Sequence, residues 1–227
     1  MRTSFWQTDR GERELEELAR RFPSLQFCPA AAEASAVVTG TFLVSAEVGY
    51  TTELEVPARY PSEVPILHCS PAEIPWELDR HVLPQSGHAC LCARSEYRMH
   101  WPEGSSLSDF IDRLIRPYFL GQFYYETHGC WPPTGARSHG WKGIIEAYVE
   151  LCAPFDDTSV ETILRLMRLL SRKNDPQGHE YCPCGSGRTL RQCHRATLTE
   201  LRRSVRPQDA AVDLSHVAQF TGVRRAA

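Results

Sequence analysis

The pattern of apolar and polar residues changes from helical to alternating early in the chain. Residues 10–22 place leucine and phenylalanine three and four positions apart among glutamate and arginine, which predicts an amphipathic helix closed by Pro23. From residue 36 to 56, β-branched and aromatic residues alternate with polar ones, which predicts two or three antiparallel strands. A short apolar run at residues 66–69 predicts a last strand. The first part of the chain is therefore expected to form a helix followed by an antiparallel meander.

Prolines interrupt the chain after the predicted strands, and helices follow. Pro61 and Pro65 cannot donate to a sheet ladder, so we expect the sheet to pause there, and an irregular stretch to cover residues 71–86. Ser106 opens a capping pattern in front of an apolar helix face. Pro117 is expected to end or kink that helix.

The second half of the chain is predicted to be helical around one ordered loop. Residues 121–143 are rich in glycine and aromatic residues, and we interpret them as a packing loop. Helices are predicted next at residues 144–149 and 160–170, the latter capped by Thr158 or Ser159. One or two further short helices are expected near the C-terminus.

Composition narrows the functional classes. With 227 residues and 42% hydrophobic content, the chain is long enough for a domain of ordinary size plus an appendage. A formal net charge of −3 argues against nucleic-acid binding driven by bulk charge. No stretch approaches the roughly 20 apolar residues that cross a bilayer, and the first residues lack the apolar run of a signal peptide. Nine cysteines, several in C-x-C pairs, indicate metal or thiol chemistry in a reducing compartment, so we expect a cytoplasmic protein without membrane contact.

Three cysteines and one histidine near the C-terminus have the spacing of a metal site. The set consists of Cys182, Cys184, Cys193 and His194. Three thiolates and one imidazole complete a tetrahedral set for zinc, and four protein ligands leave no exchangeable position, so the predicted Zn²⁺ is structural. A module this short has too small a core to fold alone, and metal binding would supply its folding free energy.

The same residues carry a resemblance to a known motif. The run Cys-Pro-Cys-Gly-Ser-Gly at residues 182–187, with Cys-His at residues 193–194, resembles the SEC-C zinc motif at the C-terminus of the SecA translocation motor. Related modules are docking surfaces for proteins or ribosomes, so the resemblance implies an acidic protein surface or RNA phosphate as the partner of the nearby arginines. A solvated basic face that binds nothing is the alternative. The arginines are Arg188, Arg191, Arg195, Arg202, Arg203 and Arg206.

Cys90 is the candidate nucleophile of the chain. It lies in a loop, residues 87–92, between the predicted strands and the predicted helices. A thiol in such a loop can act as a nucleophile, or it can be packed as a small hydrophobe, which is the commoner role of a free cysteine. Cys92 is open to two interpretations as well, a resolving thiol or a buried cysteine.

Three short motifs around Cys90 resemble those of ubiquitin-conjugating enzymes. Residues 60–65, Tyr-Pro-Ser-Glu-Val-Pro, are similar to the family's Tyr-Pro-x-x-Pro-Pro turn. Residues 87–91, Gly-His-Ala-Cys-Leu, are similar to its Gly-x-x-Cys-Leu active-site sequence, and residues 101–102, Trp-Pro, are similar to its Trp-x-Pro loop with a shorter spacing. The order of helix, meander, proline turn, cysteine loop and helices over residues 11–120 also resembles that family.

The resemblance implies an α+β fold, a ubiquitin-conjugating-enzyme-like antiparallel meander with flanking helices plus a small C-terminal zinc module. We expect residues 1–173 to form the ubiquitin-conjugating-enzyme-like domain with a C-terminal helical extension. Residues 174–227 are expected to form the SEC-C-like zinc-binding module and a tail, because the turn-rich residues 174–178 indicate a boundary.

The function that the resemblance implies is ubiquitin-like protein conjugation by a transferase that uses Cys90 as a thioester carrier. Its implied partners are a ubiquitin-like modifier or a protein tail carrying a C-terminal glycine, an activating enzyme, and an acceptor protein or a nucleotidyltransferase. Proteins of this kind resemble components of bacterial conjugation systems, including anti-phage operons.

One departure from the family affects the chemistry. The family's His-Pro-Asn sequence, whose asparagine stabilises the oxyanion, would fall shortly before Cys90, but residues 80–84 read Arg-His-Val-Leu-Pro. Loss of an oxyanion donor costs about 10²–10³ in rate. His81 and His88 are therefore the candidate catalytic groups beside Cys90, because each can donate an N–H or accept a proton near neutral pH; a structural hydrogen bond is the alternative role of both.

Two other functions stay open, and the missing asparagine favours the first of them. The first is a catalytically silent adaptor of the same fold, which docks a protein or ribonucleoprotein partner through the zinc module. The second is a cysteine hydrolase, in which a histidine activates Cys90.

Overall fold

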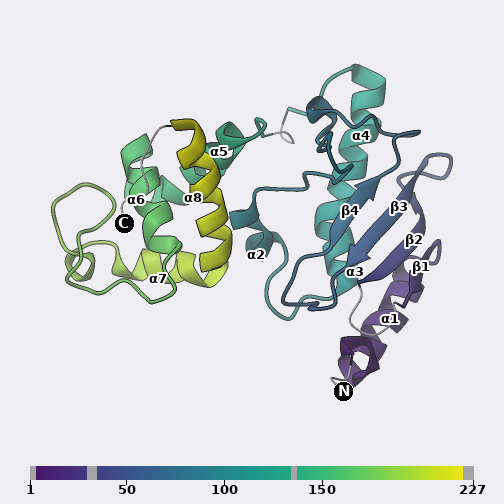
Figure 1. Ribbon diagram of the computed structural model, residues 1–227, viewed down its shortest axis with the longest axis horizontal. Helices are drawn as coiled ribbons and strands as arrows, with labels where there is room; N and C mark the ends of the chain where they lie inside the picture. The colour runs from purple at the N-terminus through teal and green to yellow at the C-terminus, as the bar shows by residue number, and fades with distance from the viewer. Residues whose placement is uncertain (1–3, 30–34, 134–136, 222–227) are drawn as a thin grey trace. The chain divides into compact units, whose positions relative to one another are not determined.

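The computed structural model describes residues 4–29, 35–133 and 137–221, and the chain divides into two compact units (Figure 1). The first unit comprises Met1–Leu91 and Gly104–Ala136, and the second comprises Cys92–Glu103 and Arg137–Ala227. The boundary predicted at residues 173 and 174 falls within the second unit. The helices that follow residue 137 therefore pack with the C-terminal cysteine cluster.

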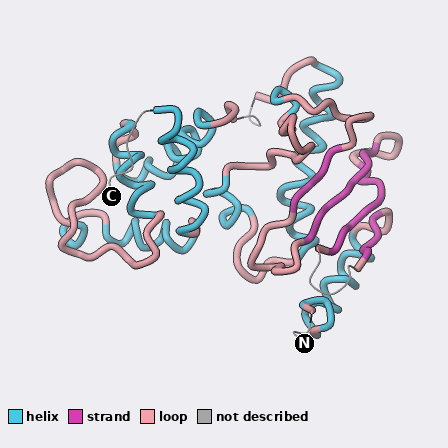
Figure 2. The backbone as a smooth tube through the Cα atoms, viewed as in Figure 1, coloured by secondary structure: helices cyan, strands magenta, loops and turns pink. Residues whose placement is uncertain are grey.

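The first unit contains a four-stranded antiparallel sheet in the order β1-β2-β3-β4 (Figure 2). The predicted strands at residues 36–56 and 66–69 are confirmed, and the α+β class with them. Strand β1 was not predicted, because four residues directly after a helix are too few to show a period of two. The strands are β1 (Leu25–Cys28), β2 (Ala36–Leu43), β3 (Gly49–Val56) and β4 (Ile66–Cys69).

Helices cover one face of this sheet. The predicted first helix is α1 (Asp9–Arg21), and the capped helix after Ser106 is α3 (Leu107–Phe110), which continues through a π-helical turn into α4 (Arg116–His128). In Figure 1, α3 and α4 lie behind the strands. Phe119 of α4 stacks on Tyr50 of β3 with ring centroids 4.9 Å apart, and its ring also contacts Phe42 of β2. The other sheet face is polar, as the exposed Thr51 and Glu53 show.

Two expectations about this helix are corrected. Of the two outcomes expected at Pro117, an end or a kink, the end is wrong, because the π-helical turn Ile111–Ile115 precedes the proline and Pro117 occupies the first turn of α4, where a missing N–H is tolerated. The packing loop predicted at residues 121–143 is shorter than expected, because residues 121–128 belong to α4 and the next helix begins at Trp141. Gly121 is therefore helical. It contacts Trp131, and a Cβ at Gly121 would lie 2.2 Å from the indole ring. Residues 134–136 of the predicted loop lie outside the described residues.

A buried carboxylate joins three segments of the first unit. Glu14 of α1 is 5% exposed and accepts hydrogen bonds from the Tyr60 hydroxyl at 2.6 Å, the Leu107 N–H at 3.0 Å and the Arg10 Nε at 2.9 Å. Burial and the bond to Glu14 raise the pKa of Tyr60, which therefore stays a neutral donor. Glu14 thus connects α1 to the proline segment and to the first turn of α3.

We expect Glu14→Gln to destabilise the first unit by about 1–3 kcal/mol, because the amide has one acceptor oxygen in place of two and turns an N–H₂ group toward Arg10 or Tyr60. Urea unfolding followed by circular dichroism would measure the change. Glu16→Gln, at an exposed position of the same helix, is the control and should be neutral. Equal stability of the two variants would contradict the role given to Glu14.

The second unit is helical in its described residues. The predicted helices at residues 144–149 and 160–170 are confirmed as α5 and α6, and Ser159 caps α6 by accepting from the Thr162 N–H. Two helices, α7 and α8, follow the cysteine cluster. Among the described residues of both units, no helix combines the length and the apolar character that a bilayer-spanning helix needs. The helices are α2 (Tyr97–His100), α5 (Trp141–Cys152), α6 (Val160–Leu170), α7 (Arg195–Ser204) and α8 (Pro207–Thr221).

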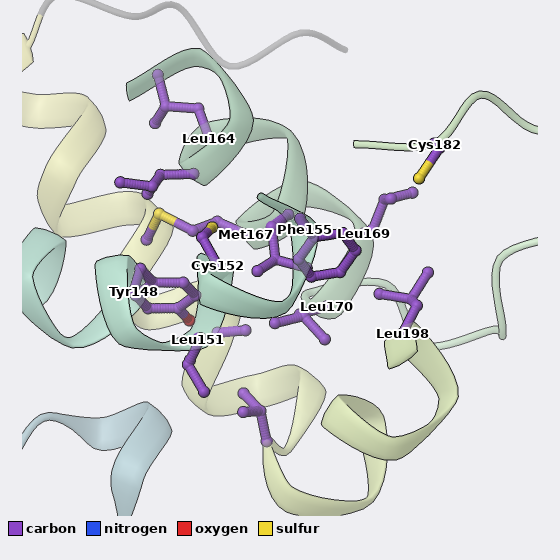
Figure 3. Close-up of a cluster of buried hydrophobic side chains, with 14 of the residues drawn as sticks. Tyr148, Leu151, Cys152, Phe155, Leu164, Met167, Leu169, Leu170, Cys182 and Leu198 are labelled. Carbon is purple, nitrogen blue, oxygen red and sulfur yellow. The ribbon is translucent and has the colours of Figure 1, made fainter. Parts of the chain in front are cut away.

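The core of the second unit includes a residue of the cysteine cluster. Figure 3 shows apolar side chains of α5, α6 and α7 around Phe155 and Met167, with Cys182 at the edge of the cluster. Cys182 is 2% exposed and Leu190 is 1% exposed. The segment with the predicted metal ligands is therefore packed into the same core as the helices of residues 141–170.

A buried acid also lies in this unit. Asp213 of α8 is 1% exposed and accepts from the Ser95 N–H at 3.1 Å, with the Tyr148 hydroxyl at 3.5 Å. Burial raises the pKa of Asp213 from 3.8 to about 6, and the nearby Asp209 acts in the same direction. The ionised form is therefore disfavoured in the folded state.

The raised pKa predicts a specific pH dependence. The folded state binds the Asp213 proton more tightly than the unfolded state does, so stability falls as pH rises from about 4 to 6 and the full cost, roughly 2–3 kcal/mol, is present above pH 6. We expect Asp213→Asn to raise the unfolding midpoint at pH 7.5 and to lose that advantage toward pH 4, as measured by calorimetry. Asp156→Asn, at an exposed position, is the control. An increase in the unfolding midpoint of Asp213→Asn that is the same at every pH would contradict the raised pKa of Asp213.

Candidate metal centre and candidate thiol site

A tight hairpin brings the four predicted metal ligands together. The Cys182 N–H donates to the Arg188 carbonyl at 2.8 Å, and Tyr181 and Thr189 form a β-bridge. Gly185 and Gly187 have φ values of +74° and +73°, which favour glycine. After the hairpin, a 3₁₀ turn over Leu190–Gln192 leads into α7. The turn places the last two ligands, Cys193 and His194, opposite the first two.

The ligand atoms have the spacing of a tetrahedral site. The Sγ atoms of Cys182, Cys184 and Cys193 and the Nδ1 of His194 lie within 4.8 Å of one another. His194 Nδ1 lies 3.4 Å from Cys182 Sγ and 3.3 Å from Cys193 Sγ, and the Sγ atoms of Cys184 and Cys193 are 3.6 Å apart. A zinc ion with Zn–S bonds of about 2.3 Å and a Zn–N bond of about 2.0 Å would separate sulfurs by about 3.8 Å and sulfur from nitrogen by about 3.5 Å. The donor set therefore fits zinc.

Neighbouring side chains hold this hairpin on the helical core. The His194 ring packs edge-on against Phe155 with centroids 5.0 Å apart. The Thr162 hydroxyl, on α6, donates to the Pro183 carbonyl at 3.1 Å. Neither residue was expected at the site, because Thr162 belongs to a predicted helix and Phe155 lies between two of them, and neither position carries a local signal of a metal site. With four protein ligands and such support, the cluster can hold a metal as a structural element.

Cys90 lies in a loop that is hydrogen-bonded to the edge of the sheet. The Cys69 N–H at the end of β4 donates to the Gly87 carbonyl and the Ala89 N–H donates to the Leu67 carbonyl, both at 2.9 Å, and the Cys90 N–H donates to the His81 carbonyl at 2.7 Å. Gly87 has a φ of +71°. These bonds fix the backbone on both sides of the thiol.

Burial controls the ionisation of this thiol. Cys90 is half-buried, and burial raises the pKa of its thiol above the ordinary value. Cys69 nearby is fully buried, with its Sγ 3.2 Å from the Tyr118 hydroxyl, and burial raises its pKa to about 11. The thiolate fraction of Cys90 at neutral pH is therefore small.

The two candidate catalytic histidines have different surroundings. His81, with a φ of 51°, is left-handed and packs its ring edge-on against Trp131 at 4.7 Å between centroids. It meets Cys90 through its backbone carbonyl. His88 packs edge-on against His68 at 4.6 Å, and burial, with His68 as a second cause, lowers the pKa of His88, which is therefore neutral at pH 7.

Cys92 and Trp101 belong to the second unit, whereas Cys90 belongs to the first. Trp101 is buried and Cys92 is half-buried. Burial, followed by the charge of Glu96, raises the pKa of the Cys92 thiol well above its ordinary value. Cys92 is accordingly protonated at neutral pH.

Comparison with known proteins identifies the hairpin. Residues 180–196 match the model of the SEC-C motif. No curated protein and no solved structure matches the chain at a significant level. The match and the geometry of the four ligands agree, and together they fit a C-terminal SEC-C zinc module.

We expect the purified protein to hold about one zinc ion per chain, and Cys184→Ser to lose it, because a hydroxyl is a poor replacement for a thiolate ligand. Elemental analysis would measure the metal, and thermal unfolding should show a lower midpoint for the second unit. Cys130→Ser, at an exposed cysteine, is the control and should keep both properties. Full zinc content in Cys184→Ser would contradict this ligand set.

Proposed function

We propose that the first unit is a ubiquitin-conjugating-enzyme-like domain that carries an acyl group as a thioester on Cys90. The order of its elements supports the proposal. Helix α1 precedes the β1-β2-β3-β4 meander, the Cys90 loop follows β4, and α3 and α4 cover one sheet face. This is the arrangement that the sequence motifs around Tyr60 and Cys90 imply.

The observation that carries the proposal is the placement of Cys90. Its loop is held at the sheet edge by backbone hydrogen bonds, and its thiol is half-buried, whereas the thiols of Cys69 and Cys152 are buried. A carrier thiol needs a fixed backbone, so that its sulfur meets an incoming carbonyl in one geometry. It also needs access from solvent.

Two acyl transfers would make up the reaction. The Cys90 sulfur attacks the carbonyl of a thioester that links the C-terminal glycine of a modifier to the activating enzyme. A new S–C bond forms, the old S–C bond breaks, and the proton of Cys90 passes to the released thiol. An acceptor amine then attacks the Cys90 thioester, an amide forms, and the proton lost by the amine returns to Cys90.

The oxyanion in each step needs a hydrogen-bond donor. The Cys90 N–H is bonded to the His81 carbonyl, so this N–H is already used. We therefore assign the role to a side chain, with His81 and His88 as the candidates. In this proposal the modifier is a ubiquitin-like protein or a protein tail with a C-terminal glycine. The acceptor is a protein, such as the nucleotidyltransferase of an anti-phage operon.

The second candidate function is a catalytically silent adaptor. The observation that favours it is the raised pKa of Cys90, for which burial is the cause. A thiol that stays protonated is a weak nucleophile. In this case the first unit would act as a binding surface, and the SEC-C module would dock the partner.

The carrier predicts a covalent intermediate. Incubation with an activating enzyme, ATP and the modifier encoded beside the gene should give an adduct on Cys90 that thiols remove, and Cys90→Ser should give an oxyester that resists them, because an ester is less reactive toward sulfur than a thioester is. Intact mass spectrometry and non-reducing gels would measure both. Cys92→Ser is the control and should keep the adduct. Two results together would establish the adaptor instead. The folded protein would form no adduct, and function in cells would be abolished by Cys182→Ala but not by Cys90→Ala.

A further inference from the structure

A cavity of about 570 Å³ lies between α6 and the metal-binding hairpin, within the second unit. Helix α6 and the residues after it contribute Arg165, Arg168 and Arg172. The hairpin contributes Tyr181, together with the backbone around Gly185. This volume is in the range of small-molecule sites, about 300–1,000 Å³. It suits a ligand larger than a single anion.

The charge of the cavity is positive. Three guanidinium groups and one carboxylate, that of Glu180, line the cavity, and pairing with acids leaves one of the guanidinium groups uncompensated. Arg172 pairs with Glu180, and Arg165 pairs with Glu161 at 2.5 Å. Arg168 is half-buried and, within the described ranges, makes no ion pair. A guanidinium without an acidic partner keeps its N–H donors available for charge-assisted hydrogen bonds to an anion.

The arginines are placed by helix α6. Arg165 and Arg168 are three residues apart and share one face of this helix, and Arg172 follows two residues after its end, while Ile163, Leu166 and Met167 are buried in the core. At Gly185, a Cβ would lie 3.4 Å from the Arg165 Nη1. The hairpin backbone at Gly185 therefore lies beside the Arg165 guanidinium.

One wall of the cavity is aromatic. Tyr181 is 76% exposed, although it lies beside Cys182, which is buried. An exposed aromatic ring beside arginines is a platform on which a planar base can stack, and guanidinium planes also stack on bases. A phosphate group would pair with the arginines through charge-assisted hydrogen bonds.

We propose that this cavity binds a nucleotide, with its phosphate on Arg168 and its base against Tyr181. The nucleotide is either free or the end of a single-stranded nucleic acid, since both present the same phosphate and base. The proposal does not depend on the role of Cys90. It assigns a ligand to residues that lie on α6 and beside the metal ligands, and so makes the zinc hairpin one wall of a binding site.

Calorimetric titration of the zinc-loaded full-length protein with adenosine monophosphate would test the site. We expect saturable binding with a dissociation constant below about 1 mM, weakened about tenfold or more in Arg168→Gln and in Tyr181→Ala. Arg203→Gln is the matched control, because Arg203 is an exposed arginine of the same unit that does not line this cavity. Zinc content, measured for each variant, should equal that of the wild type.

Three comparisons decide the outcome. A phosphorylated oligonucleotide that binds more tightly than the mononucleotide, through Arg168, identifies a strand end as the source, and equal binding identifies a free nucleotide. Inorganic phosphate that binds as tightly as the nucleotide overturns the role of Tyr181 and with it the proposal. Binding that Arg168→Gln leaves unchanged, or absence of binding to the zinc-loaded protein, overturns the proposal as well, and Arg168 then serves only to offset the negative charge of the metal ligands.

Discussion

The burial of the Cys182 sulfur is the constraint on which the second unit depends. Cys182 is 2% exposed and belongs to the same apolar cluster as Leu198 and Phe155. A thiolate in such surroundings is costly unless a cation compensates its charge. Zinc would satisfy the charge and at the same time fix the hairpin against α6. Metal binding and helix packing would then be parts of one folding equilibrium, because the ion would remove the cost of burying the thiolate.

In the first unit, burial acts on Cys90 in two opposite ways. It raises the pKa of the thiol and so reduces the thiolate available for attack. A thioester on the same sulfur is neutral, so the half-buried site disfavours the charged leaving group more than the loaded state. For a carrier, the second effect would keep the acyl group on Cys90 until an acceptor arrives. An adaptor depends on neither the thiolate fraction nor the stability of a thioester. The backbone bonds from Gly87 to Cys90 serve both functions equally, since they fix the loop regardless of the state of the sulfur.

Helix α6 shows how one element serves two purposes. Its buried face, with Leu166 and Met167, holds the core, and its arginine face borders the cavity beside the hairpin. The apolar face is required for folding and determines the rotation of the helix about its axis. The position of Arg168 follows from that rotation, so the polar side is free to vary without loss of the core. The charges of this face are therefore open to a binding role.

Several features follow from the sequence alone, because their causes are local. The four metal ligands lie within 13 residues, and two glycines are enough to close the hairpin between them. The alternation at residues 36–56 and the helical spacing at residues 160–170 each identify their elements, since one face is buried in both.

Tertiary structure decided what local pattern does not contain. It placed α5 and α6 with the metal-binding hairpin, continued the helix beyond Pro117, and brought Trp131 into contact with Gly121. It also set the burial of Cys90 and joined Arg168 to Tyr181 in one cavity. Each of these depends on contacts between segments far apart in the chain. The spacing of apolar residues predicts which side of an element is buried, but it does not predict which segment covers that side. The pKa values, the charge and the solvent access of a site depend on the covering segment.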